Sequence, residues 1–218
     1  MQTEIIAVDP AKPDAAAVAR AAERLRAGAI VAFPTETVYG LGCLAEHDES
    51  VARIYALKNR PPDRPLGVYL AEPGEIVRRV GRVSAEARRL IERYLPGPLT
   101  IVLEEASGSK TGFRVSPNRV LVELIKAVGR PLVGTSANPS GAPSPTRPAD
   151  VLEAFQGKID IVLDAGPTEL GTDSTVIDCT TSPPAIIREG AIPAAEIASV
   201  LGITLDTDRK PPPNRQIG

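Results

Sequence analysis

Four groups of polar residues interrupt the apolar runs of this chain, and their types suit the binding of anions. Hydroxyl and guanidinium groups at strand ends can hold phosphate and carboxylate oxygens. Two arginines also stand inside otherwise apolar segments, Arg114 in FRV and Arg188 in IIRE. This pattern predicts a protein that binds an anion or a nucleotide. The four groups are Thr35, Glu36, Thr37 and Tyr39; Lys58, Arg60 and Arg64; Ser136 and Asn138; and the hydroxyls of GTDSTV at 171–176.

Each group also has a structural interpretation that needs no ligand. An arginine in a strand can pair with a surface glutamate, and strand-end serines and threonines often bond to their own backbone. A lysine at the C-terminus of a helix is favoured by the helix dipole, which alone could explain Lys58. We favour ligand binding because all of these features would otherwise need separate explanations.

Several familiar chemistries are disfavoured by the sequence. GSKT at 108–111 is similar to the end of a phosphate loop, but a Walker motif needs a glycine where Leu103 stands. A GxGxxG pattern that begins at Gly40 would need its third glycine at Ala45. His47 is the only histidine and lies in the polar segment AEHDES, so histidine-dependent triads are disfavoured. No Cys/His cluster has the spacing of a zinc site, and no metal site is expected.

The composition is ordinary for a globular protein: 43% of the residues are hydrophobic, 24% are charged, and the net charge is −2. This charge gives no global basic field for non-specific nucleic-acid binding. Cys43 and Cys179 lie far apart in apolar runs, which favours buried thiols over a disulfide. MQTEIIAVDP has no signal-peptide pattern, and no apolar run reaches the ~18 residues of a membrane helix. We therefore expect a cytoplasmic protein without a membrane partner.

Helical and strand patterns alternate along the chain, which predicts one α/β sheet with helices packed on it. Ligands of such sheets bind where the loops at strand ends diverge, so the polar groups are expected to meet there. SANPSGAPSPTRPAD at 136–150 is expected to form a shaped surface loop. Helices are expected at 15–27, 48–58 and 84–95, after Pro117 and from Pro193, and strands at 29–33, 38–45, 65–70, 99–103, 113–115, 131–134, 160–164, 174–178 and 185–189.

A series of segments, taken in order, resembles the YrdC-like family, which includes threonylcarbamoyl-AMP synthases. The resemblance runs from about residue 15 to residue 192. It implies a single twisted, open, mixed sheet with helices packed on it and a large central cavity. We expect a catalytic domain over 1–205 and a flexible tail over 206–218. The segments are PTETVYGLG, LKNRPPDRPL, LPGPLT, FRV, TSANPSG, SPT, GTDSTVID and IIREG.

The resemblance also implies a nucleotidyltransferase reaction. L-threonine, bicarbonate and ATP give threonylcarbamoyl-AMP and pyrophosphate, with Mg²⁺ carried by ATP. Downstream proteins then use the adenylate to modify the adenosine beside the anticodon of tRNA. Two alternatives are a paralogue that makes a carbamoyl-adenylate from carbamoyl phosphate and an RNA-binding module of the same fold. Direct tRNA contact would use basic residues such as Arg78, Arg88 and Arg93, although a solvated helix face is the favoured interpretation of these.

Individual residue roles are carried over from the family motifs. Tyr69 stands where many family members have histidine, and Arg114 is expected to pair with the carboxylate of threonine. By resemblance, Lys58, Arg60, Ser136 and Asn138 form the catalytic signature; Arg60, Arg64, Ser136, Ser144 and Arg188 hold ATP; and Thr35, Thr37, Tyr69, Arg114 and Ser174 line the threonine site.

The segment PTETVYGLG carries two further expectations. In an extended chain Thr35 and Thr37 share one face, and Glu36 points the other way. The threonines are therefore expected to contact substrate, and Glu36 is expected to be a structural partner. Gly40 and Gly42 are expected to let the backbone pass close to the ligand.

Overall fold

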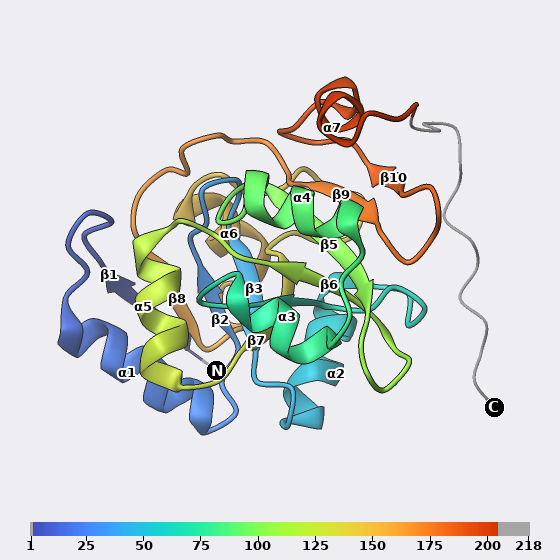
Figure 1. The fold of residues 1–218 in the computed structure, drawn as a ribbon. Coiled ribbons are helices and arrows are strands. Elements are labelled where there is room, and N and C mark those ends of the chain that lie inside the picture. The colour runs from blue at the N-terminus through green and yellow to red at the C-terminus, as the bar shows by residue number, and fades with distance from the viewer. Residues whose placement is uncertain (1, 205–218) are drawn as a thin grey trace.

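The computed structural model describes residues 2–204, which form a ten-stranded sheet with helices packed on it (Figure 1). The strand order is β1-β8-β2-β3-β7-β4-β6-β5-β9-β10. Four strand pairs are parallel and the rest are antiparallel, so the sheet is mixed, as predicted. The expected tail at 206–218 lies outside the described residues. The strands are β1 (Glu4–Ala7), β2 (Val31–Phe33), β3 (Gly40–Cys43), β4 (Gly67–Tyr69), β5 (Leu99–Glu104), β6 (Lys110–Arg114), β7 (Leu132–Ser136), β8 (Ile161–Asp164), β9 (Thr175–Asp178) and β10 (Ala185–Arg188).

Seven helices lie within the described part of the chain, and two begin at capping residues that the sequence predicts. Asp14 caps the first helix by accepting a hydrogen bond from the Ala17 N–H at 2.9 Å. Ser84 caps the fourth by accepting from the Ala87 N–H at 3.2 Å. The helices are α1 (Ala15–Arg26), α2 (Asp48–Lys58), α3 (Gly74–Val80), α4 (Ala85–Tyr94), α5 (Arg119–Val128), α6 (Pro148–Phe155) and α7 (Ala194–Leu201).

Helices cover both faces of the sheet around β2. Val31 and Phe33 pack into a hydrophobic cluster with α1 and α5. Ile30 and Ala32 pack into a different cluster with α2 and α6. Because successive side chains of a strand point to opposite faces, these two clusters lie on opposite sides of the sheet. The sheet is therefore buried on both faces at β2.

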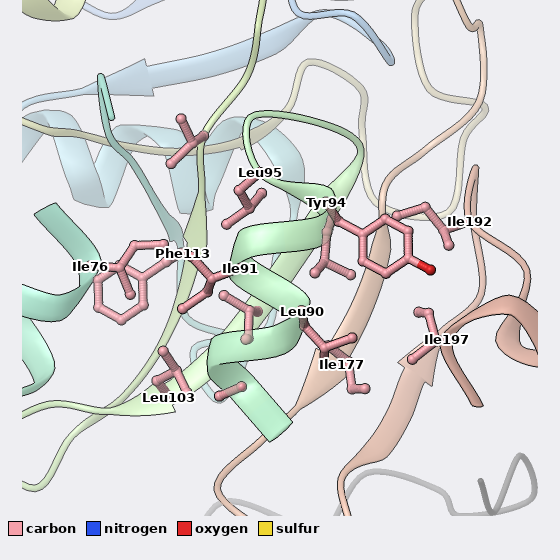
Figure 2. Close-up of a cluster of buried hydrophobic side chains, with 14 of the residues drawn as sticks. Ile76, Leu90, Ile91, Tyr94, Leu95, Leu103, Phe113, Ile177, Ile192 and Ile197 are labelled. Carbon is pink, nitrogen blue, oxygen red and sulfur yellow. The ribbon is translucent and has the colours of Figure 1, made fainter. Parts of the chain in front are cut away.

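The other half of the sheet, from β4 to β10, has a hydrophobic cluster on one face beneath α3, α4 and α7 (Figure 2). Leu99, Ile101 and Phe113 belong to this cluster. Their strand neighbours Thr100 and Arg114 therefore point to the opposite face. The alternation in β5 and β6 thus separates the apolar core from a polar face, which we call the polar face of β4–β10.

The sequence patterns do not predict β1, α3 or α6. β1 has only four residues at the edge of the sheet, and α3 has no side-chain hydrogen bond at its N-cap. The loop expected at 136–150 ends earlier, because α6 begins at Pro148. The Asp150 carboxylate accepts from the backbone N–H groups of Thr146 at 3.1 Å and Arg147 at 3.0 Å, which fixes the start of this helix.

Both cysteines are free thiols, as predicted; Cys43 is buried and Cys179 is half-buried. Burial raises the pKa of each thiol to about 12. Neither is therefore suited to act as a nucleophile near neutral pH. No helix within residues 2–204 combines the length and the apolar character needed to cross a bilayer.

Candidate active site

The strand register aligns side chains from distant segments on the polar face of β4–β10. Tyr69 of β4 pairs with Arg114 of β6, which pairs with Thr100 of β5. Thr100 pairs with Val176 of β9, and Val176 pairs with Arg188 of β10. A row of residues thus runs across neighbouring strands. It includes three residues that the family resemblance assigns to ligands: Tyr69, Arg114 and Arg188.

Arg114 is the centre of a buried ion-pair network. Its Nη2 donates to Glu36 Oε1 at 2.5 Å and to Thr37 Oγ1 at 3.0 Å. Glu36 accepts a second hydrogen bond from Ser116 Oγ, so it is a structural partner, as expected, but it meets the same Arg114 nitrogen as Thr37 and does not point the other way. The Nε of Arg114 is buried and has no hydrogen-bond partner in the described structure. Because buried donors are normally satisfied, this unused N–H is suited to an acceptor oxygen of a ligand.

Residues 35–38 form a turn, and the expected extended conformation is wrong. Thr35 Oγ1 accepts from the N–H groups of Thr37 at 3.1 Å and Val38 at 3.2 Å, and it donates to the Val38 carbonyl at 2.6 Å. These bonds use the one donor and both acceptor sites of a hydroxyl. Thr37 Oγ1 lies 2.9 Å from Thr35 Oγ1. The threonines do lie together, but Thr35 stabilises the turn whereas Thr37 contacts Arg114.

Gly40 and Gly42 make room for protein atoms, and the expectation that they let the backbone pass close to a ligand stays a prediction. A Cβ atom at Gly40 would lie 2.4 Å from Cε2 of Phe33, and one at Gly42 would lie 2.8 Å from the Val133 carbonyl oxygen. Both separations are shorter than real Cβ contacts. The Phe33 ring in turn meets the ring of Tyr69 edge-on, with the centroids 5.2 Å apart. These glycines therefore let Phe33 support Tyr69.

Lys58, the last residue of α2, is only 2% exposed and anchors the loop after β7. Its Nζ donates to the Ser136 carbonyl at 2.5 Å, to the Asn138 carbonyl and, at 3.4 Å, to Asn138 Oδ1. The Asn138 side chain donates to the Ala142 carbonyl at 2.6 Å. Burial lowers the pKa of Lys58 to about 8. Lys58 and Asn138 thus shape the loop that presents Ser136.

Arg60 lies in the loop between α2 and β4 and bonds to that loop. Its Nε donates to the Arg64 carbonyl at 2.7 Å, and its Nη2 donates to the Pro65 carbonyl at 2.9 Å. Burial lowers the pKa of Arg60. The positive charge of Arg60 in turn lowers the pKa of Lys58, so the two cations lie within electrostatic reach. The helix-end K-x-R pattern therefore places two positive charges close together.

A carboxylate that the sequence interpretation missed joins the remaining predicted residues. Asp173 accepts from Ser144 Oγ at 3.1 Å and 3.0 Å and lies 3.7 Å from Nη1 of Arg188. Nη2 of Arg188 donates to the Ser174 carbonyl at 2.9 Å, and Ser174 Oγ lies 2.9 Å from Thr100 Oγ1. The signal was present in GTDSTV, where the acid stands beside the hydroxyls.

Tyr69 links these two networks. Burial raises the pKa of its hydroxyl, and the charges of Arg114, Glu36, Arg188 and Asp173 also act on that pKa. The Arg114 network and the Asp173 network therefore lie within electrostatic reach of one phenol. The set offers cations and hydroxyl groups without a histidine, so it suits an anionic substrate that supplies its own nucleophile.

Two pockets lie beside these residues. One, of about 630 Å³, runs between the 137–146 loop and α6 and is lined in part by Asn138 and Ser144. The other, of about 320 Å³, is lined in part by Thr35 and Glu36. The large central cavity implied by the resemblance stays a prediction.

Comparisons with known proteins relate this chain to a protein family. The Sua5/YciO/YrdC profile, described as telomere recombination, matches residues 23–190. The threonylcarbamoyl-AMP synthase of Pyrococcus abyssi is 41% identical over 191 residues, which cover 84% of this chain and 56% of that protein. The Bacillus subtilis protein of the same name is 37% identical over 195 residues, with 85% and 56% covered. The chain thus spans little more than half the length of these relatives.

A solved structure extends the match to the fold. The crystal structure of P. abyssi Sua5 complexed with L-threonine superposes with a TM-score of 0.87 at 38% identity. The match covers 93% of this chain and 62% of that one. Profile, sequence identity and fold agree over most of the described residues, and the chain belongs to the Sua5/YciO/YrdC family.

Proposed function

We propose that this chain forms threonylcarbamoyl-AMP from L-threonine, bicarbonate and ATP, with release of pyrophosphate. The observation that carries the proposal is Arg114: a buried guanidinium with an unused Nε, on the same sheet face as Arg188 and Tyr69. The names of the relatives and the bound L-threonine of the P. abyssi structure support the same activity. They support it over the carbamoyl phosphate paralogue and over an RNA-binding module.

The reaction needs positioning and charge stabilisation more than a protein nucleophile. The amine of threonine attacks the carbon of bicarbonate, and loss of water leaves a carbamate. A carbamate oxygen then attacks the α-phosphorus of ATP, and the bond to the leaving pyrophosphate breaks. Side chains that hold the reactants in line and neutralise phosphate charge are sufficient for such a step.

We assign the residues to two groups of contacts. Arg114, Thr37, Tyr69 and Ser174 would bind threonine, with the Arg114 guanidinium on its carboxylate. The position of Thr35 in its own turn makes it a positioning residue in this proposal. Arg60, Arg64, Ser136, Ser144 and Arg188 would bind ATP, and Lys58 and Asn138 would hold the Ser136 loop in place.

The residues present fit a Mg²⁺ ion that arrives with ATP. Residues 2–204 contain no group of three or more His, Cys, Asp or Glu side chains placed to hold a metal. Mg²⁺ usually binds through one or two carboxylates together with substrate phosphates, and Asp173 offers one carboxylate beside Ser144. The ion would neutralise phosphate charge. Threonylcarbamoyl-AMP would pass to downstream proteins that modify tRNA. We expect this chain to act in the cytoplasm.

The basic helix residues favour the solvated-face interpretation over an RNA site. Arg78 pairs with Glu72 at 2.7 Å, and Arg89 donates to the Leu201 carbonyl at 3.3 Å. The guanidinium of Arg93 lies over the ring of Tyr94, 5.6 Å from its centroid. These arginines are thus engaged with neighbouring protein groups.

The test is pyrophosphate release by purified protein with ATP, Mg²⁺, bicarbonate and L-threonine. Release is expected only when threonine is present. Arg114→Ala is expected to reduce the threonine-dependent rate by roughly 100-fold, comparable to the loss of one preorganised charge-stabilising donor. Arg60→Ala is expected to weaken ATP binding, and the exposed Arg82→Ala is the matched control. A rate that does not depend on threonine would contradict the proposal.

A further inference from the structure

Asp173 places a negative charge among the side chains proposed to bind ATP. Both of its carboxylate oxygens accept from Ser144 Oγ, at 3.1 Å and 3.0 Å. Its Oδ1 lies 3.7 Å from Nη1 of Arg188. The Asp173 side chain is 32% exposed, so it can be reached by a ligand. Ser144 and Arg188 are therefore both engaged with a carboxylate.

This arrangement opposes the binding of a bare triphosphate. A phosphate that accepts from Ser144 must either displace Asp173 or lie close to it. Two negative groups a few ångströms apart repel each other strongly at a half-buried site, where water screens them less than in bulk solution. The charge of Asp173 also reaches Lys58 and Tyr69, so its field covers the centre of the site.

The other carboxylate of the site cannot take the same role. Glu36 is 5% exposed, and its two oxygens accept from Arg114 and Ser116. Asp173, in contrast, is partly exposed and accepts from a hydroxyl group that could rotate away. A divalent cation prefers such an accessible oxygen, and it would complete its coordination with phosphate oxygens and water.

We propose that Asp173 makes nucleotide binding by this chain depend on a divalent cation. This inference rests on the proposed function. Without the cation, the carboxylate repels the phosphates and retains Ser144 and Arg188. A bound cation would offset the charge of Asp173, and the carboxylate would then favour the bound nucleotide instead of repelling it. Asp173 thus selects the magnesium complex of ATP over the free nucleotide.

A competing explanation is that Asp173 only positions Ser144 and Arg188. The two explanations differ in their consequences for Asp173→Asn. Asparagine keeps a carbonyl oxygen that can accept from Ser144, but it removes the charge. A positioning role predicts that Asp173→Asn lowers the affinity for free ATP and for the magnesium complex by the same factor. The cation-dependent role predicts that the substitution tightens the binding of free ATP without tightening the binding of the magnesium form.

The experiment is calorimetric titration of the full chain with ATP in EDTA and with ATP in excess Mg²⁺. Wild-type protein is expected to bind the magnesium form at least about tenfold more tightly than free ATP, which corresponds to a charge interaction of about 1.4 kcal/mol. Asp173→Asn is expected to bind free ATP about tenfold more tightly than wild type and to lose most of the preference for the magnesium form. Glu92→Gln, an exposed carboxylate change on α4, is the matched control and is expected to behave as wild type.

The outcomes separate this inference from the proposed function. A preference for the magnesium form that persists unchanged in Asp173→Asn would overturn the inference and leave the proposed function standing. An equal loss of affinity for free ATP and for the magnesium form in Asp173→Asn would also overturn the inference and leave the proposed function standing. No binding of ATP by wild-type protein in either condition would overturn both. Thermal melting of each variant establishes that a change in affinity is not a loss of fold.

Discussion

The Glu36–Arg114 pair fixes the position of one guanidinium at the scale of single residues. Each residue is 5% exposed, so each depends on the other for charge compensation. Removal of one partner leaves an uncompensated buried charge, which is strongly destabilising. The pair is therefore both a stability element and the support for the proposed threonine contact.

Substitution of Glu36 by Gln is expected to lower the free energy of unfolding by about 3 kcal/mol, because Arg114 keeps its charge. The KM for threonine is expected to rise as well, since the guanidinium loses its fixed position. Urea unfolding and initial rates measure the two effects. The exposed Glu92→Gln change is the control, with an expected effect within about 0.5 kcal/mol. A loss below about 1 kcal/mol for Glu36→Gln would argue against a buried ion pair.

Lys58 gives a prediction about pH. Its folded pKa of about 8 lies below the ordinary lysine value of 10.5. Between these values the unfolded chain binds more protons, so the contribution of Lys58 to the free energy of unfolding rises with pH. Relative to Lys58→Met, wild-type protein is expected to gain about 2 kcal/mol between roughly pH 7.5 and 9.5. Urea titrations of both proteins measure the difference; a difference that is flat or falls with pH contradicts the assigned environment.

Individual side-chain roles were only partly predictable. The spacing of PTETVYGLG predicted Glu36 as a structural partner, but through an extended conformation that the chain does not adopt. It could not separate the roles of Thr35 and Thr37, because a threonine that caps its own turn and one that contacts a ligand have the same sequence signal. Asp173 was not predicted, because the surrounding hydroxyl groups indicate anion binding. The role of this carboxylate follows only from its contacts with Ser144 and Arg188.

At the scale of elements, the strand and helix patterns predicted most of the chain, and the exceptions have physical causes. Asp14 and Ser84 gave clear helix starts. α6 was not predicted, since Pro148 and the polar residues before it are as typical of a loop as of the start of a helix. The glycines of β3 were predicted to serve the ligand, but their role depends on Phe33, which only the strand pairing brings against them.

A Gly40→Ala substitution tests that role of β3. The added methyl group would overlap the Phe33 ring, whose position also supports Tyr69. We expect a loss of about 2 kcal/mol in the free energy of unfolding, as in other overpacked cores. Gly67→Ala in β4 is the matched control, because its nearest contact is the Gly112 carbonyl oxygen at an ordinary 3.4 Å. If chemical denaturation shows equal losses for both variants, the overlap with Phe33 is not the cause.

At the scale of the whole molecule, the site is a product of strand order. The sheet places β4 beside β6, β6 beside β5, and β5 beside β9, and this order aligns Tyr69, Arg114 and Thr100 in one row. Alternation in the sequence predicts which residues share a face of one strand. It does not predict which strands are neighbours, so the residue types of the site could be predicted but not their contacts.

The most direct test of the proposed activity follows the carbon of bicarbonate. Protein incubated with ATP, Mg²⁺, L-threonine and radiolabelled bicarbonate is expected to form a labelled product that contains both AMP and threonine. The label is expected to be absent without threonine and strongly reduced in Arg114→Ala, while Arg82→Ala forms product as wild type does. Hydrolysis of ATP without incorporation of the label into an adenylate would contradict the proposed activity.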